Sequence, residues 1–281
     1  MAQNLPALAV TGATGALGGA VARLLAEAGV GHRLLARHPA RLPSLPDVPV
    51  YAVTYADRPA AEKALRGVEV LFMVSVEEHP RRWEEQRTFV DAAAEAGVRH
   101  IVYTSFMAAA PDAVFTLARD HWDTEEYIRG HRITHTFLRN CLYQDVLPGF
   151  AGPDGVIRGP AGEGRLAAVA RADVARAAAR ILARPEDHRD RTYTLTGPQA
   201  LNFSEIAAIL TRVTGSRVSY HNETLPEAIE SRQAAGASPW QAEAWASTYA
   251  AVAAGQLSSV SQDVEQLTGT PPIRLERYLL Q

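Results

Sequence analysis

Gly12-Ala-Thr-Gly-Ala-Leu-Gly18 follows a predicted strand over Leu8–Thr11 and begins a predicted helix that runs to about Ala28. Glycines in such a turn let the backbone approach a pyrophosphate closely, and the free N–H groups of the helix start bind its oxygens. A purely structural turn is the alternative. The position of the G-x-x-G-x-x-G motif between a first strand and a first helix favours a dinucleotide site.

Apolar runs alternate with segments of helical period through the first half of the chain. We expect further strands at His32–Arg37, Val50–Thr54, Val68–Ser75, His100–Ser105 and Thr134–Asn140. We expect helices between them at Ala60–Leu65, Trp83–Ala96 and Leu117–Arg129. This alternation predicts an α/β fold with a doubly wound parallel sheet of the Rossmann type.

The pattern changes after Phe150. The loop-like segment 151–164 holds five glycines and two prolines, which indicates turns. Beyond it we expect helices at Arg171–Ala183 and Phe203–Thr214, the second capped by Asn202 or Ser204 and ended by Gly215, a strand at Thr192–Thr196, and helical structure over 222–254. We therefore expect a dinucleotide-binding domain over residues 1–150 and a smaller, mostly helical substrate or lid lobe over 151–281, interleaved with the first and not independent.

Composition limits the classes of function. The formal net charge is −3 and 47% of the residues are hydrophobic, so neither nucleic acid nor a membrane is the expected partner. The N-terminus has no basic segment before its first strand, so we expect no signal peptide and a cytoplasmic protein. With Cys141 as the one cysteine there is no internal disulfide, and the nine histidines show no metal-ligand spacing, so we expect no metal site.

Arg37 stands where the second strand ends. Many NAD-specific sites carry a carboxylate about 20 residues past the glycines, which accepts a hydrogen bond from the ribose 2′-hydroxyl. A guanidinium there binds a 2′-phosphate instead. The sequence therefore predicts NADP(H) as the preferred cofactor and NAD(H) as the second choice. The alternative for Arg37 is stacking on the adenine or exposure to solvent.

Several stretches resemble the NmrA-like branch of the atypical short-chain dehydrogenases, and within it the bacterial NAD(P)H:quinone oxidoreductases and triphenylmethane reductases. They begin with the glycine-rich turn and extend over nearly the whole chain. The other matching stretches are 92–106, Asp120-His-Trp-Asp-Thr-Glu125, Thr136-Phe-Leu-Arg-Asn-Cys-Leu-Tyr143, Arg171-Ala-Asp-Val-Ala175 and Tyr193-Thr-Leu-Thr-Gly-Pro198.

The resemblance implies a set of cofactor contacts. The pyrophosphate would lie against Gly12, Thr14, Gly15, Ala16, Leu17 and Gly18. Arg37 would contact the 2′-phosphate, and Val74 and Ser75 the adenine-side ribose. The nicotinamide half would lie near Thr104, Ser105, Asn140, Cys141, Leu142 and Tyr143. Ordinary hydrogen bonding at strand ends is the alternative for Ser75, Ser105 and Asn140, and a core position for Tyr143. Cys141 is expected to be a small buried hydrophobe rather than a nucleophile.

Two departures from the family pattern concern chemistry. Relatives often carry an adenine-binding Asp after the third strand, whereas this chain has Thr54 there and Asp57 three residues later. Most short-chain dehydrogenases also use a Tyr-x-x-x-Lys pair, in which the phenol transfers a proton. The only lysine here is Lys63, and the corresponding helix carries Leu117 and His121. The sequence therefore has no phenol–ammonium pair.

The missing pair disfavours an epimerase, a dehydratase or an alcohol dehydrogenase. We expect an NAD(P)H-dependent oxidoreductase that transfers hydride directly to a quinone-like or other conjugated small-molecule acceptor, with a homodimer as the candidate assembly. The candidate catalytic residues are His121, Ser105 and Tyr143. His121 either binds the ribose or acts as a weak acid, or else it lies on the helix surface beside Glu125. The alternative function is an NAD(P)-sensing regulatory protein without turnover.

Three aromatic residues, Trp240, Trp245 and Tyr249, fall on one predicted helix. We expect them to pack against the sheet domain rather than to stack on a substrate. A mobile flap over the nicotinamide is the alternative interpretation.

Overall fold

The computed structural model describes residues 5–42 and 45–281 and divides into two compact units. The first unit comprises residues up to 105 together with 122–138 and 174–193. The second comprises 106–121, 139–173 and 194–281. This division differs from a single boundary at residue 150, because most of the helix over 171–183 returns to the first unit after the chain has entered the second.

A seven-stranded sheet carries the first unit and has the strand order β3-β2-β1-β4-β5-β6-β8. The strands are β1 (Leu8–Thr11), β2 (Arg33–Ala36), β3 (Val50–Ala52), β4 (Val70–Met73), β5 (His100–Phe106), β6 (Thr134–Asn140) and β8 (Arg191–Leu195). The pairs that join β3, β2, β1, β4 and β5 are all parallel. The order confirms the predicted Rossmann-type sheet. Several strands end earlier than predicted, since the chain turns away at the carboxyl edge of the sheet.

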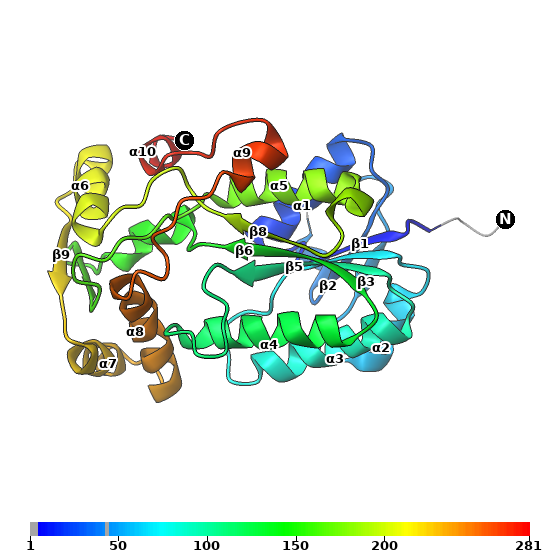
Figure 1. The fold of residues 1–281 in the computed structure, drawn as a ribbon, viewed down its shortest axis with the longest axis horizontal. Coiled ribbons are helices and arrows are strands. Elements are labelled where there is room, and N and C mark those ends of the chain that lie inside the picture. The colour runs from blue at the N-terminus through cyan, green and yellow to red at the C-terminus, as the bar shows by residue number, and fades with distance from the viewer. Residues whose placement is uncertain (1–4, 43–44) are drawn as a thin grey trace. The chain divides into compact units, whose positions relative to one another are not determined.

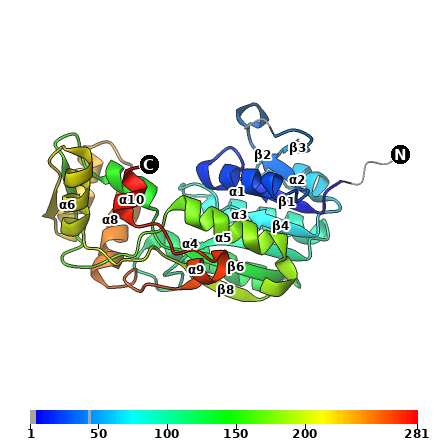
Figure 2. The same ribbon diagram turned by 90° about the horizontal axis from the view of Figure 1, so that it is seen from above.

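Helices cover both faces of this sheet (Figures 1 and 2). On one face lie α1 (Ala16–Glu27) and α5 (Arg171–Ala183), and on the other α2 (Arg58–Leu65), α3 (Arg82–Glu95) and α4 (Thr116–Gly130). Phe89 of α3 packs with Ile101 of β5 and Phe137 of β6, and none of the three is exposed to solvent. Burial on both faces explains why the central strands are apolar throughout.

Helices predominate in the second unit, as expected, but two short strands were missed. These are β7 (Val156–Gly159) and β9 (Ser219–Asn222), which pair in parallel. The helices of this unit are α6 (Phe203–Thr214), α7 (Leu225–Ala234), α8 (Pro239–Ala253), α9 (Asp263–Thr268) and α10 (Leu275–Leu279). A short 3-10 helix lies at Gln144–Phe150 in the same unit, and two more lie at Pro39–Arg41 and Pro185–His188 in the first unit. Glycines and prolines around β7 hide it, because the strand depends on a distant partner rather than on local pattern.

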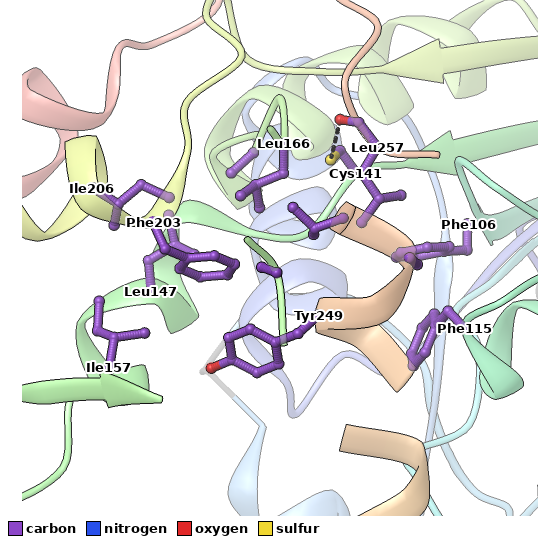
Figure 3. Close-up of a cluster of buried hydrophobic side chains, with 14 of the residues drawn as sticks. Phe106, Phe115, Cys141, Leu147, Ile157, Leu166, Phe203, Ile206, Tyr249 and Leu257 are labelled. Carbon is purple, nitrogen blue, oxygen red and sulfur yellow. Dashed lines mark hydrogen bonds between the residues drawn. The ribbon is translucent and has the colours of Figure 1, made fainter. Parts of the chain in front are cut away.

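Tyr249 and Phe203 lie in the aromatic core of the second unit (Figure 3). Tyr249 stacks on Phe203 with ring centroids 4.8 Å apart. A side chain at Gly159 would bring a Cβ to 2.3 Å from the Tyr249 ring, so this position requires glycine.

The capping box of α6 is formed by Asn202 and Glu205, which decides between the two predicted caps in favour of Asn202.

Candidate cofactor site

Backbone geometry explains why two positions of the turn, Gly12 and Gly18, are glycines. Gly12 has a positive φ of 64°, which favours glycine. A Cβ on Gly18 would lie 2.4 Å from the Gly12 carbonyl oxygen, so the start of α1 packs directly on the turn. The Gly15 N–H donates to the same carbonyl at 2.9 Å. These contacts hold the turn tightly against the first helix.

The N-terminus of α1 is open to an anion. Its N-cap is Gly15, which has no side chain to cap the first turn, and no acidic residue lies in that turn. Thr14, Gly15 and Ala16 are exposed, while Leu17 is buried. Backbone N–H groups and the helix dipole both favour negative charge at such a position. The residues present therefore fit a pyrophosphate.

Arg37 follows β2 directly and is paired with Glu77 in the segment after β4. The guanidinium donates two hydrogen bonds to the two carboxylate oxygens, at 2.8 and 3.1 Å. The side chains of Arg37 and Glu77 are 56% and 63% exposed. The pKa of Glu77 is lowered, first of all by its hydrogen bonds with Arg37. Sequence reasoning identified Arg37 but not its partner.

A hydrogen-bonded network joins the ends of the central strands. The Val74 N–H donates to Thr11 Oγ1 at 2.9 Å, and the Ser75 N–H donates to Thr104 Oγ1 at 2.8 Å. The Tyr55 hydroxyl donates to the Val74 carbonyl at 2.7 Å. The network holds in place the carboxyl edge of the sheet, where the predicted ribose contacts Val74 and Ser75 lie. Thr104 therefore uses its hydroxyl within the sheet, which is the ordinary strand-end role.

Tyr55 and Asp57 both lie in the segment that follows β3. Tyr55, which the sequence did not single out, stacks on Phe89 with ring centroids 4.0 Å apart and the planes within 3°. Burial raises its pKa. Asp57 caps α2 by accepting a hydrogen bond from the Ala60 N–H at 3.1 Å. The carboxylate nearest to the family's adenine-binding position is therefore engaged in a helix cap.

The Ser105 side chain makes a fully buried hydrogen bond. Its Oγ donates to a Glu125 carboxylate oxygen at 2.6 Å, and Ser105 is 3% exposed whereas Glu125 is not exposed at all. Arg129 lies 3.3 Å from the other Glu125 oxygen. These contacts tie the end of β5 to α4 and correspond to a structural use of the serine hydroxyl.

His121 and Leu117 occupy the positions of the absent Lys and Tyr on α4. Both are buried, at 7% and 4% exposure. The His121 ring stacks on Phe106 with centroids 6.1 Å apart. The interpretation of His121 as a helix-surface residue is therefore wrong, because its ring is buried against Phe106. Lys63 lies exposed in the last turn of α2.

Asn140 and Tyr143 lie together in the second unit. Asn140 Nδ2 donates to the Tyr143 hydroxyl at 3.2 Å. Asn140 is 3% exposed, and among residues 5–42 and 45–281 its Oδ1 has no hydrogen-bond partner. The Arg171 guanidinium lies 4.8 Å from the centroid of the Tyr143 ring. Burial raises the pKa of Tyr143 to about 12, so the phenol stays protonated at neutral pH.

The two residues between them are held by the backbone. Cys141 is 2% exposed, its Sγ lies 3.9 Å from the Leu257 carbonyl oxygen, and burial raises its pKa to about 12 (Figure 3). The Leu142 carbonyl accepts a hydrogen bond from the Val169 N–H at 2.9 Å. The thiol is thus a buried hydrophobic group, as predicted, and a poor nucleophile.

The aromatic residues of α8 differ in their surroundings. Tyr249 is buried in the core of the second unit, Trp240 packs against that core, and Trp245 is 40% exposed. Tyr249 and Trp240 therefore pack within the second unit, so the prediction that they pack against the sheet domain is wrong. No group of three His, Cys, Asp or Glu residues in the described ranges has the geometry of a metal site. Within the same ranges, no helix has the length and apolar character needed to cross a membrane.

Comparisons with known proteins agree with this architecture. The model of the NmrA-like family matches residues 6–238. Quinone oxidoreductase 2 of Escherichia coli is 32% identical over 95% of this chain and 96% of its own. The crystal structure of that enzyme with NADPH has a TM-score of 0.89 and covers 97% and 98% of the two chains. These matches define a reductase-like class of Rossmann-fold protein.

Two further relatives extend the comparison. A (4-alkanoyl-5-oxo-2,5-dihydrofuran-3-yl)methyl phosphate reductase of Streptomyces griseus is 36% identical over 93% of each chain. The structure of Citrobacter sp. triphenylmethane reductase with NADP(H) is 33% identical, with a TM-score of 0.84 over 97% and 98% of the two chains. This chain belongs to the NmrA-like family.

Proposed function

We propose that the protein is an NAD(P)H-dependent oxidoreductase that prefers NADPH and reduces quinone-like or other conjugated acceptors by direct hydride transfer. The observation that carries the proposal is the uncapped start of α1 behind the Gly12–Gly18 turn, with Arg37 at the end of the neighbouring strand. Named reductases of similar length, two of them solved with NADPH or NADP(H), support the class of reaction and the cofactor.

Different groups of this chain bind different parts of the cofactor. The N–H groups at the start of α1 receive the pyrophosphate oxygens, and Arg37 receives the 2′-phosphate. Val74 and Ser75 offer backbone at the adenine-side ribose, held in place by Thr11 and Thr104. When bound, the cofactor supplies the hydride from its nicotinamide ring.

This site lacks the proton-transfer pair that most short-chain dehydrogenases use. No tyrosine–lysine pair stands on α4, where Leu117 and His121 are buried. A carbonyl substrate needs a protein acid that supplies a proton along with the hydride, and an alcohol substrate needs a protein base that removes one. A quinone or a similar conjugated acceptor delocalises the charge and takes its proton from water. The protein then contributes chiefly orientation and exclusion of competing reactions.

The Asn140 amide is the group of this chain that we assign to the acceptor or the nicotinamide carboxamide. Its unpartnered Oδ1 is buried, and a buried polar atom without a hydrogen bond is costly. A rotation of the amide by 180° exchanges the positions of its accepting oxygen and its donating nitrogen. Either assignment leaves one hydrogen-bonding position open beside Tyr143.

Turnover tests the proposal against cofactor sensing. Purified protein is mixed with NADPH and a panel of simple quinones, and the nicotinamide absorbance is followed. We expect consumption of NADPH that depends on the quinone and is slower with NADH. Tight NADPH binding without consumption across the panel would favour the sensing alternative.

A further inference from the structure

The Arg37–Glu77 pair crosses the place where the glycine-rich turn begins. β2 and β4 are the two sheet neighbours of β1. Arg37 comes directly after β2, Glu77 lies four positions past the end of β4, and the turn follows β1. The carboxyl ends of parallel strands meet at one edge of a sheet. The two side chains therefore join across the end of β1 at the edge where a dinucleotide binds in this class of fold.

The geometry of the pair matches that of a phosphate contact. Two parallel N–H···O bonds from one guanidinium to two oxygens of one acid form the bidentate arrangement that carboxylates and phosphates share. A single planar guanidinium cannot present the same two N–H groups to both acids at once. An anion that takes this face of Arg37 must displace the Glu77 carboxylate.

We propose that Glu77 is a specificity-determining residue that competes with the 2′-phosphate of NADP(H) for Arg37. This rests on the proposed role of Arg37. NADPH must break the ion pair to reach the guanidinium, and the displaced carboxylate then stands close to the phosphate. NADH carries no phosphate there and leaves the pair intact. Glu77 thus lowers the preference for NADPH over NADH without itself binding either nucleotide.

The exposure of the pair makes the exchange reversible. Both side chains are more than half exposed, and exposed ion pairs are weak because water and salt screen them. A phosphate at neutral pH carries more charge than a carboxylate, so it wins the competition. His79 contributes a smaller lowering of the Glu77 pKa than Arg37 does. The acid is therefore ionised at neutral pH and available to Arg37 whenever the phosphate is not.

The test compares Glu77→Gln with Glu78→Gln. The second variant removes the same charge one residue along the chain and controls for the net charge. Dissociation constants for NADPH and NADH are measured by calorimetric titration at fixed salt. We expect Glu77→Gln to bind NADPH about twofold to fivefold more tightly, the range that corresponds to an exposed ion pair. NADH affinity stays unchanged, and Glu78→Gln leaves the ratio of the two affinities unchanged.

The double variant Arg37→Ala/Glu77→Gln separates the steps of the argument. If Glu77 acts by occupying Arg37, the gain from Glu77→Gln shrinks or disappears in the Arg37→Ala background. Equal changes for NADPH and NADH, or no gain for NADPH, would overturn the proposal. If Arg37→Ala alone fails to weaken NADPH selectively, the role of Arg37 falls. If neither nucleotide binds the wild type, the proposed function itself falls.

Discussion

The glycine-rich edge of the first unit and the Asn140–Tyr143 segment of the second present their hydrogen-bonding groups in opposite ways. At the first, exposed backbone of Thr14, Gly15 and Ala16 and an exposed guanidinium offer hydrogen bonds to solvent. At the second, the Asn140 amide is buried and partly satisfied by its own neighbour. The comparison supports the proposal that backbone geometry provides affinity for the cofactor, whereas a few buried side chains provide its orientation.

Gly18→Ala attacks the first region and carries the largest expected effect. The new Cβ would meet three backbone atoms of Thr11 and Gly12 at 2.4 to 2.6 Å, and backbone cannot rotate away as a side chain can. We expect NADPH affinity to fall about a hundredfold, at the upper end of overpacking costs. Gly130→Ala in α4 is the matched control, since no heavy atom lies within 4 Å of its added Cβ. Unchanged binding in Gly18→Ala would contradict the assigned approach of the pyrophosphate.

Arg37→Ala sharpens the same region. We expect NADPH affinity to fall about tenfold to thirtyfold, as for the loss of hydrogen bonds to a charged group, and NADH affinity to stay nearly constant. Fluorescence titration with both nucleotides measures the ratio. Arg41→Ala removes a neighbouring exposed arginine and serves as control. Equal losses for both nucleotides would show that Arg37 does not bind the 2′-phosphate.

Tyr143→Phe tests the second region. The hydroxyl that accepts from Asn140 is lost, so we expect the free energy of unfolding to fall by about 1 kcal/mol. We also expect kcat for quinone reduction to fall about fivefold, since about 1 kcal/mol of lost orientation has that effect, while NADPH affinity stays constant. Chemical denaturation and steady-state kinetics measure the two effects. A fall in stability with unchanged kcat would make Tyr143 a core aromatic only.

Cys141 provides the smallest expected effect. Because burial raises its pKa to about 12, the thiolate is nearly absent at about pH 8. We expect a thiol reagent to leave the folded protein unlabelled and to react only after denaturation. Cys141→Ala should keep kcat within about twofold of wild type, because a small buried hydrophobe is replaced by another. Rapid labelling with loss of turnover would contradict this account of the segment.

Local requirements made the first region predictable from sequence. The Gly12–Gly18 turn has glycines at a fixed spacing, so three residues locate it and predict its role. The partners of those residues were not predictable, because they come from distant parts of the chain. Glu77 lies 40 residues from Arg37, and Tyr55 reaches the end of β1 from 44 residues away.

The second region could be identified only through family resemblance. Asn140 ends a stretch whose pattern predicts a strand and nothing more, and Tyr143 follows three residues later. The pairing of Ser105 with Glu125 likewise joins a strand end to a helix and leaves no local signal. β7 was missed for the same reason, since its partner β9 lies far along the chain. Sequence pattern thus reveals elements, while contacts between them need the structure.

A single-turnover reaction tests the central claim most directly. Wild-type protein loaded with NADPH is mixed with a simple quinone, and loss of the nicotinamide absorbance is followed with hydrogen or deuterium at the transferable C4 position. Direct hydride transfer predicts consumption of NADPH only when quinone is present, with a slower rate for the deuterated cofactor. Stable NADPH binding without consumption in the presence of quinone would contradict the account.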